Sequence, residues 1–277
     1  MKLALVFLAL IAGSSGLQIP RKHGPSELIF GGSPAKLGQW PWQVLLGNSY
    51  SYCGGTLITK RHVLTAAHCL PLLRRNSMAM LGIIDKSDPY SSPGAQLLRV
   101  RSTTVHPDYK HGGSFHNDIG IVTLASEANM TDYVKTIKIK AFDTELLKQK
   151  DGFITGYGTF SFENGYPEDS DDLLSVQVPL IAQQRCRTQW TRVSRNKVFI
   201  SDSQICAGTK GRGLGDGDSG GPLQVKTDDW YQIGIASFVS NKPHLMENQA
   251  DYPGVYTRTS KFCDFMAKAT DNEFKCV

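Results

Sequence analysis

Short apolar runs separated by turn-forming residues constrain the fold of this chain more than any other feature. The runs are rich in Val, Ile, Leu, Thr and Tyr, and Gly, Pro, Asn and Ser interrupt them. Many short strands with turn signals between them favour antiparallel barrels or a sandwich. The sequence therefore predicts an all-β fold. The runs are residues 43–46, 55–58, 62–65, 97–101, 119–124, 152–155, 174–179, 221–225, 233–238 and 254–257.

Only the tail has a helical pattern. Phe262, Phe265 and Met266 are spaced i, i+3 and i+4, which places them on one helix face. This spacing predicts a C-terminal helix over about residues 260–270.

The chain has 277 residues and is 40% hydrophobic. This length and composition can bury the core of one large all-β unit or of two small domains.

The first residues are typical of a secretory signal. Residues 1–16 hold one Lys, an apolar run over 3–12 and four small residues, and the run is too short to span a bilayer. We therefore expect a protein secreted to the extracellular space, with no membrane partner. In such an oxidising compartment the six cysteines favour disulfides, although sequence alone leaves their pairing open.

The charge pattern argues against a nucleic-acid partner. The net charge of +5 is mild, and acids are interspersed among most of the basic residues. Two segments stand out: residues 159–172 are acidic and predict an exposed, mobile loop, and residues 185–197 are basic. For the basic segment we favour a solvated face over a patch for a polyanion or a protein partner.

A serine among glycines is the first candidate for catalysis. Ser219 lies in the segment 215–222, with Asp218 before it and glycines on both sides. Glycines let a hydroxyl stand clear of side chains while backbone N–H groups turn toward one point, as a nucleophile requires. An ordinary surface turn is the alternative for this segment considered alone.

A histidine and an aspartate upstream complete a catalytic set. His68 follows small residues and precedes Cys69, which could hold it still. Asp118 stands at the head of an apolar strand, where a buried carboxylate is costly without a partner. An imidazole is a suitable partner for that carboxylate.

Over residues 29–270 the chain resembles a chymotrypsin-like serine protease, most closely the secreted chymotrypsin- and collagenase-like proteases of arthropods. The resemblance implies two packed six-stranded antiparallel Greek-key barrels, over about 29–140 and 141–258, within a protease domain 29–277. It is carried by Ile-Phe-Gly-Gly at 29–32, Trp-Pro-Trp-Gln-Val at 40–44, Thr-Ala-Ala-His-Cys at 65–69, Asn-Asp-Ile at 117–119 and Gly-Asp-Ser-Gly-Gly-Pro at 217–222.

The resemblance also implies a mechanism. Ser219 attacks the scissile carbonyl, His68 takes its proton, and Asp118 orients the imidazole. Backbone N–H groups of Gly217 and Ser219 form the oxyanion hole, and Ser237 hydrogen-bonds the buried aspartate. No cofactor and no metal is implied. The histidines His106, His111 and His116 invite a metal interpretation, but their spacing of five suits neither a helix face nor a strand face.

Activation by proteolysis is a further implication. In the family, a cut before the Ile-x-Gly-Gly start frees an amine that pairs with the acid before the serine. Here residues 17–28 form the activation peptide, the cut lies between Leu28 and Ile29, and the acid is Asp218. Most relatives present Arg or Lys where this chain has Leu28. We therefore expect a chymotrypsin- or elastase-like activating protease, or self-activation.

The residues implied for the specificity pocket are Gly213, Leu214, Val239 and Gly254. Trypsin-like members carry Asp at the position of Gly213, so cleavage after Arg or Lys is disfavoured here. The bulk of Leu214 and Val239 predicts cleavage after Leu, Phe, Tyr or smaller apolar residues, with a chymotrypsin-like preference favoured over an elastase-like one.

The resemblance implies the disulfides Cys53–Cys69 and Cys186–Cys206, which leaves Cys263 to pair with Cys276. The bridge that relatives carry across the specificity pocket is missing, because Gly215 stands at one of its positions and residues 239–253 contain no cysteine. Asn129 begins a glycosylation sequon.

Expected partners are protein or peptide substrates, the activating protease and protease inhibitors, with the chain acting as a monomer. The alternative is a catalytically weak or inactive homologue that serves as a secreted binding protein. The altered pocket and activation site favour it, and the presence of His68, Asp118, Ser219 and Gly217 argues against it.

Overall fold

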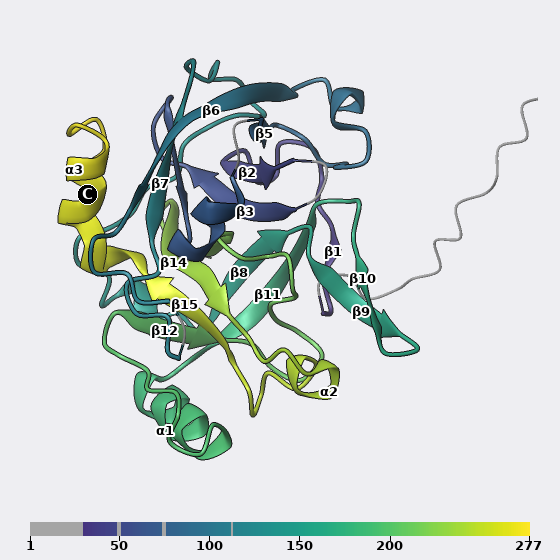
Figure 1. Cartoon of the computed structure of the whole chain (residues 1–277), viewed down its shortest axis with the longest axis vertical. Helices are drawn as coiled ribbons and strands as arrows, with labels where there is room; N and C mark the ends of the chain where they lie inside the picture. The colour runs from purple at the N-terminus through teal and green to yellow at the C-terminus, as the bar shows by residue number, and fades with distance from the viewer. Residues whose placement is uncertain (1–29, 49–50, 74–75, 112) are drawn as a thin grey trace, which may run out of the picture.

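The computed structural model describes residues 30–48, 51–73, 76–111 and 113–277 (Figure 1). The signal and activation segments predicted from the sequence, including Leu28 and Ile29, lie outside these residues. In the part that is described, no helix has the length and apolar character that crossing a bilayer requires.

The first half of the chain forms a closed antiparallel barrel with the strand order β2-β3-β4-β7-β6-β5. Its strands place aliphatic side chains inward, and Val44, Leu46, Leu57, Val63 and Val122 form its core. The strands are β2 (Gln43–Gly47), β3 (Tyr52–Leu57), β4 (His62–Thr65), β5 (Met78–Leu81), β6 (Gln96–Val105) and β7 (Gly120–Leu124).

The second half forms another barrel, with the order β11-β12-β15-β14-β13-β8, which closes because β8 also pairs with β11. The short strand β1 (Ser33–Pro34) adds to β11, so the start of the described chain lies on the second barrel. The strands are β8 (Asp151–Gly156), β11 (Leu174–Ile181), β12 (Gln204–Ala207), β13 (Pro222–Lys226), β14 (Trp230–Phe238) and β15 (Gly254–Arg258).

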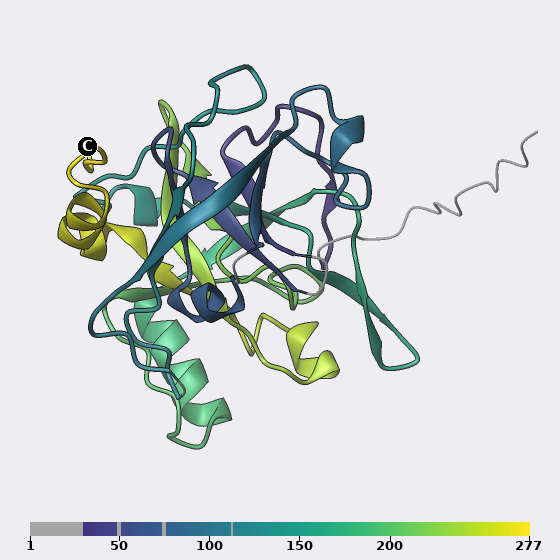
Figure 2. The ribbon, with the colours of Figure 1, turned by 45° about the horizontal axis from the view of Figure 1, so that its top comes forward.

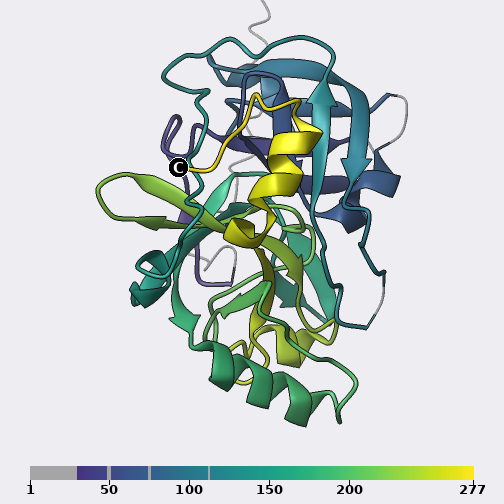
Figure 3. The same ribbon diagram turned by 90° about the vertical axis from the view of Figure 1, so that its left-hand side faces the viewer.

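The predicted C-terminal helix is present. α3 (Cys263–Ala269) follows a 3-10 turn, η4 (Thr259–Phe262), and lies along the side of the molecule next to both barrels (Figure 3). Phe262 and Met266 are buried in one cluster with Leu64 of the first barrel and Ile235 of the second. The helix therefore covers the junction between the barrels. Other short turns are η1 (Ala67–Leu72), η2 (Pro89–Ser91) and η3 (Leu146–Lys148).

The prediction of two six-stranded barrels is confirmed, but the expectation that only the tail is helical is wrong. The basic segment contains α1 (Gln183–Val193), and a short helix α2 (Pro243–Met246) follows β14. α1 buries Cys186, Gln189 and Trp190, spaced i, i+3 and i+4, against the second barrel. Because this stripe contains no aliphatic residue, an aliphatic pattern does not reveal it.

The acidic segment also differs from the loop predicted for it. It forms an antiparallel hairpin of β9 (Thr159–Glu163) and β10 (Tyr166–Asp169), which projects from the barrels (Figures 1 and 2). Thr159 Oγ1 donates to Asp169 and Ser161 Oγ donates to Glu168, so cross-strand hydrogen bonds hold the carboxylates. Phe160 and Phe162 alternate with Thr159 and Ser161 in β9, and the aromatic and β-branched residues favour a strand.

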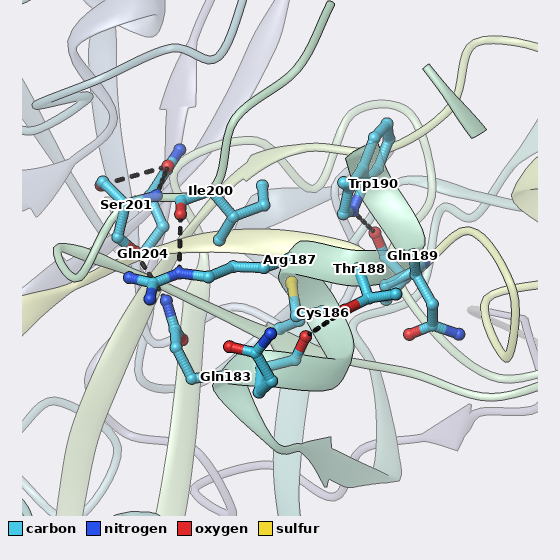
Figure 4. Close-up of a disulfide and its surroundings, with 12 residues drawn as sticks. Gln183, Cys186, Arg187, Thr188, Gln189, Trp190, Ile200, Ser201 and Gln204 are labelled. Atoms are coloured by element: carbon cyan, nitrogen blue, oxygen red, sulfur yellow. Dashed lines mark hydrogen bonds between the residues drawn. A yellow bond between two sulfur atoms is a disulfide. The ribbon is translucent and has the colours of Figure 1, made fainter. Parts of the chain in front are cut away.

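Three disulfides link the described chain: Cys53–Cys69, Cys186–Cys206 and Cys263–Cys276. The first joins β3 to η1, the second joins α1 to β12, and the third ties α3 to the chain end. Figure 4 shows the surroundings of Cys186, where Arg187 Nε donates to the carbonyl of Ile200 (3.0 Å) and Trp190 Nε1 donates to that of Pro253 (3.1 Å).

Candidate active site

His68 and Asp118 meet because two strands of the first barrel are paired. β4 and β7 run antiparallel with Thr65 opposite Gly120, so η1 after β4 comes close to the residues before β7. His68 Nδ1 lies 2.7 Å from Asp118 Oδ2, and the backbone N–H of His68 donates to Oδ1 at 2.9 Å. The aspartate is fully buried and the imidazole is 17% exposed. The carboxylate therefore fixes both the ring and the backbone of the histidine.

The second barrel also contributes donors to Asp118. Ser237 Oγ on β14 donates to Asp118 Oδ2 (2.6 Å), and Thr257 Oγ1 on β15 donates to the Asp118 carbonyl (2.8 Å). A buried carboxylate is costly unless it is hydrogen-bonded, and the Ser237 hydroxyl lowers that cost, whereas Thr257 binds the backbone carbonyl. The residue is therefore a tie between the barrels as well as a partner of the imidazole.

Ser219 lies in the turn that precedes β13, against the first barrel. Its carbonyl accepts from the Gly54 N–H (2.7 Å) and lies 3.5 Å from Sγ of Cys69, the residue after His68. A Cβ on Gly54 would stand only 2.7 Å from the backbone of Gly221, so this close approach requires glycine. Within the described residues no hydrogen bond joins the Ser219 hydroxyl to the imidazole. Such bonds are commonly long in unliganded enzymes.

Gly217 has a left-handed backbone conformation (φ +90°), which glycine adopts readily. Its N–H, one of the two expected oxyanion donors, donates to the exposed carboxylate of the neighbouring Asp216 (3.1 Å). A substrate oxyanion that used this N–H would have to displace Asp216. The sequence motif gives no indication of this contact.

Asp218 points away from Ser219 into a fully buried site. Its carboxylate accepts backbone N–H groups from Gly158 (2.9 Å) and Gly215 (2.8 Å). Burial raises the pKa of Asp218 to about 7. The two backbone hydrogen bonds lower the pKa, and the nearby carboxylates of Asp169 and Asp216 raise it further. Near neutral pH this carboxyl is therefore poised between its neutral and charged forms.

A cleft of about 440 Å³ opens beside Ser219. Leu214 and Val239, two of the four residues assigned to the pocket, line it, and Met246 adds a third apolar wall. Phe162 and Pro167 of the β9–β10 hairpin are also part of the lining. The side chain of Gln249 occupies the space in front of Gly213 and Gly254, the other two residues assigned to the pocket, and the Leu214 side chain also packs against Gly254.

An aromatic wall on the His68 side was not predicted. Phe115 packs edge-on against the His68 ring (centroids 5.9 Å apart) and stacks on Phe238 (5.5 Å). Phe115 has φ +47°, unusual for a bulky residue, and no sequence period marks it as part of a site. Of the three histidines considered for a metal, His106 packs against Phe262 and Phe265, and His111 packs against Phe115.

One cluster with metal-ligand chemistry occurs in the described chain, namely Cys53, His68 and Cys69. Its two sulfurs are bonded to each other, so they are not available as thiolate ligands.

Asn129, the first residue of the predicted glycosylation sequon, is exposed after β7. The Gln96 side chain hydrogen-bonds both the backbone N–H and the backbone carbonyl of Asn129.

Comparison with known proteins agrees with this geometry. The Trypsin family model matches residues 29–266. The chain belongs to the trypsin family of serine endopeptidases. Its similar relatives include proteases of bees and a mosquito, consistent with the predicted likeness to arthropod enzymes.

Three relatives illustrate the match. Venom serine protease Bi-VSP of Bombus ignitus is 35% identical over 85% of this chain, and the chain spans 66% of that protein. Venom protease of Bombus pensylvanicus is 34% identical over 85% of this chain and 96% of its own length. CLIP domain-containing serine protease B4 of Anopheles gambiae is 27% identical over 87% of this chain and 70% of its own length.

The buried carboxyl of Asp218 leads to a pH prediction for the uncleaved chain. Its pKa is about 7 in the fold and about 4 when unfolded, so its stabilising contribution is complete below pH ~4 and is lost as the pH rises through 7. We compare Ser219→Ala with the double variant Ser219→Ala/Asp218→Asn by denaturant unfolding at several pH values. Between pH ~4 and ~7 the free energy of unfolding of Ser219→Ala should fall by a few kcal/mol relative to that of the double variant. Free energies that change with pH in parallel would contradict this.

Proposed function

We propose that this trypsin-family chain is a secreted serine endopeptidase that uses Ser219, His68 and Asp118 and is made as a zymogen. The observation that carries the proposal is the buried carboxylate of Asp118 bonded to the imidazole of His68, with Ser219 held beside Cys69. This arrangement supports acyl transfer to a serine hydroxyl with a histidine as general base.

The protonation of the ring follows from its partner. Asp118 offers oxygen acceptors, so the 2.7 Å contact favours the proton on Nδ1 of a neutral imidazole. Nε2 then carries the free lone pair and takes the Ser219 proton during attack. The imidazolium that forms is stabilised by the same carboxylate, and the proton passes to the leaving amine. Gly217 and Ser219 N–H groups stabilise the oxyanion once Asp216 is displaced.

The substrate residue before the scissile bond is apolar in this proposal. Leu214, Val239 and Met246 give the cleft apolar walls, and among the described residues that line it Asp216 is the one carboxylate. An Arg or Lys side chain would lose its hydration among these residues without gaining a buried anion. We favour a chymotrypsin-like over an elastase-like preference.

Activation by cleavage between Leu28 and Ile29 is supported by Asp218, a buried carboxyl whose hydrogen-bond partners in the described chain are backbone amides. A freed amine beside it would supply a cation and keep it ionised. The bee relatives are named as venom proteases, and this, together with the predicted signal segment, supports an extracellular location. Activating proteases and protease inhibitors are the partners we propose, for a protein acting as a monomer.

Labelling of Ser219 tests the proposal. The activated protein should form a covalent adduct with a fluorophosphonate at Ser219, because the imidazole activates that hydroxyl. Ser219→Ala should give no adduct, and His68→Ala should slow labelling by a factor of roughly 10³ or more. An activated, folded protein that takes no label would favour the alternative of a binding protein without activity.

A panel of peptide p-nitroanilides that differ only in the residue before the scissile bond tests specificity. We expect kcat/KM after Leu or Phe to exceed that after Arg by roughly 10² or more, because a buried cation would lack a partner. Faster turnover after Arg than after Leu or Phe would refute the apolar-cleft assignment.

The terminus of the active protein tests activation. N-terminal sequencing should begin Ile-Phe-Gly-Gly, and a start at Lys22 or His23 would exclude the proposed cut. The new amine has a reference pKa of about 8, and pairing with Asp218 raises its pKa in the fold. Activity should persist below that pKa and fall as the pH climbs through it.

A further inference from the structure

Gln249 is a fully buried amide in the loop that follows α2. Its Oε1 accepts the backbone N–H of Leu214 (3.0 Å), and its Nε2 donates to the carbonyls of Leu214 (2.6 Å) and Met246 (3.1 Å). Both hydrogens of the amide nitrogen are therefore used. The side chain ties together two segments that each contribute an apolar wall to the substrate cleft.

The same amide fills space that the sequence had assigned to the pocket. A Cβ on Gly213 would stand 1.9 Å from Gln249 Oε1, and a Cβ on Gly254 would stand 3.0 Å from it. On the other side, the Leu214 side chain lies between Gly254 and the cleft, 3.1 Å from where that Cβ would be. Gln249 therefore occupies the position behind Leu214 that a deeper cleft would use.

Helix α1 supports this loop from outside. Gln189 Nε2 donates to the Ala250 carbonyl (2.5 Å), and Trp190 Nε1 donates to the Pro253 carbonyl (3.1 Å). Figure 4 labels both side chains on α1, which the Cys186–Cys206 disulfide joins to β12. The residues that follow Gln249 in the chain are thus fixed to a rigid element.

We propose that Gln249 is a specificity-determining residue that sets the depth of the cleft for the substrate side chain before the scissile bond. It does so by filling the space in front of Gly213 and Gly254 and by holding Leu214 in place as a wall of the cleft. Gln249 acts through Leu214 and does not itself line the cleft, so it is a positioning residue. The inference rests on the proposed peptidase function and deepens it.

The test separates the volume of Gln249 from its hydrogen bonds. Gln249→Ala removes both, and Gln249→Leu keeps most of the volume while removing the hydrogen bonds. The readout is the ratio of kcat/KM for a Phe substrate to that for an otherwise identical Leu substrate, with enzyme concentrations fixed by fluorophosphonate titration. Leu214 can recede in Gln249→Ala, so this ratio should rise about tenfold, a difference of the size that small pocket changes produce.

Gln249→Leu should keep the ratio within about threefold of the parent, even if the variant is less stable. Adding Gly213→Ala to Gln249→Ala returns a methyl group to the emptied space and should bring the ratio back toward the parent. If Gln249→Ala reduced kcat/KM for the Phe and the Leu substrate by the same factor, the ratio would equal that of the parent. This result would overturn the inference and leave Gln249 a purely structural residue.

Thermal unfolding gives a second readout that does not need activity. Gly213→Ala should lower Tm in the parent, where the methyl would meet the amide, and lower it much less in Gln249→Ala. Equal shifts in the two backgrounds would also overturn the inference. If the activated parent cleaves neither substrate and forms no adduct with the fluorophosphonate, the proposed function fails. The unfolding comparison then still shows whether Gln249 fills the space in front of Gly213.

Discussion

The buried carboxylate of Asp118 is the interaction on which the rest of this structure depends. A charge at this depth is costly unless donors surround it, and here the donors come from two barrels. His68 supplies its ring and its backbone N–H from the first barrel, and Ser237 supplies its hydroxyl from the second. Thr257 of the second barrel donates to the backbone carbonyl of Asp118. The two barrels are thus assembled around one carboxylate, and that assembly also orients the imidazole.

The position of Ser219 depends on how closely the barrels approach. Gly54 on β3 touches the turn at Gly221, and its N–H holds the Ser219 carbonyl. The Cys53–Cys69 disulfide fixes β3 to the turn that carries His68. Histidine and serine are therefore anchored to the same strand from two sides, and small residues at the contact are a geometric requirement.

Gln249 and Asp218 are buried polar side chains near the cleft, and they differ in their hydrogen-bond partners and in whether they can carry a charge. Gln249 uses both hydrogens of its amide nitrogen and its oxygen without carrying a charge, which suits a fixed structural tie. Asp218 accepts two amide hydrogen bonds, and burial still raises its pKa to about 7. Gln249 therefore fixes the cleft wall at Leu214, and the carboxyl poised for a cation lies a few residues after Leu214 in the chain.

Much of this account could be predicted from the sequence, because it depends on local patterns. Short apolar runs between turn-forming residues predicted most of the barrel strands, and the glycines around Ser219 and the small residues before His68 indicated the candidate site. The parts that could not be predicted depend on contacts between distant segments. Phe115 reaches His68 through an unusual backbone turn, α1 buries a stripe without aliphatic residues, and Gln249 resembles any polar loop residue until its distance to Gly213 is known.

The most direct test of the central claim is proton NMR of the mature protein labelled with ¹⁵N-histidine. A short bond from an imidazole N–H to a buried carboxylate deshields its proton and protects it from exchange. The account predicts one far-downfield, slowly exchanging N–H that belongs to His68 Nδ1, persists in Ser219→Ala and disappears in Asp118→Asn. A spectrum without that resonance, or one in which it survives Asp118→Asn, would contradict the account.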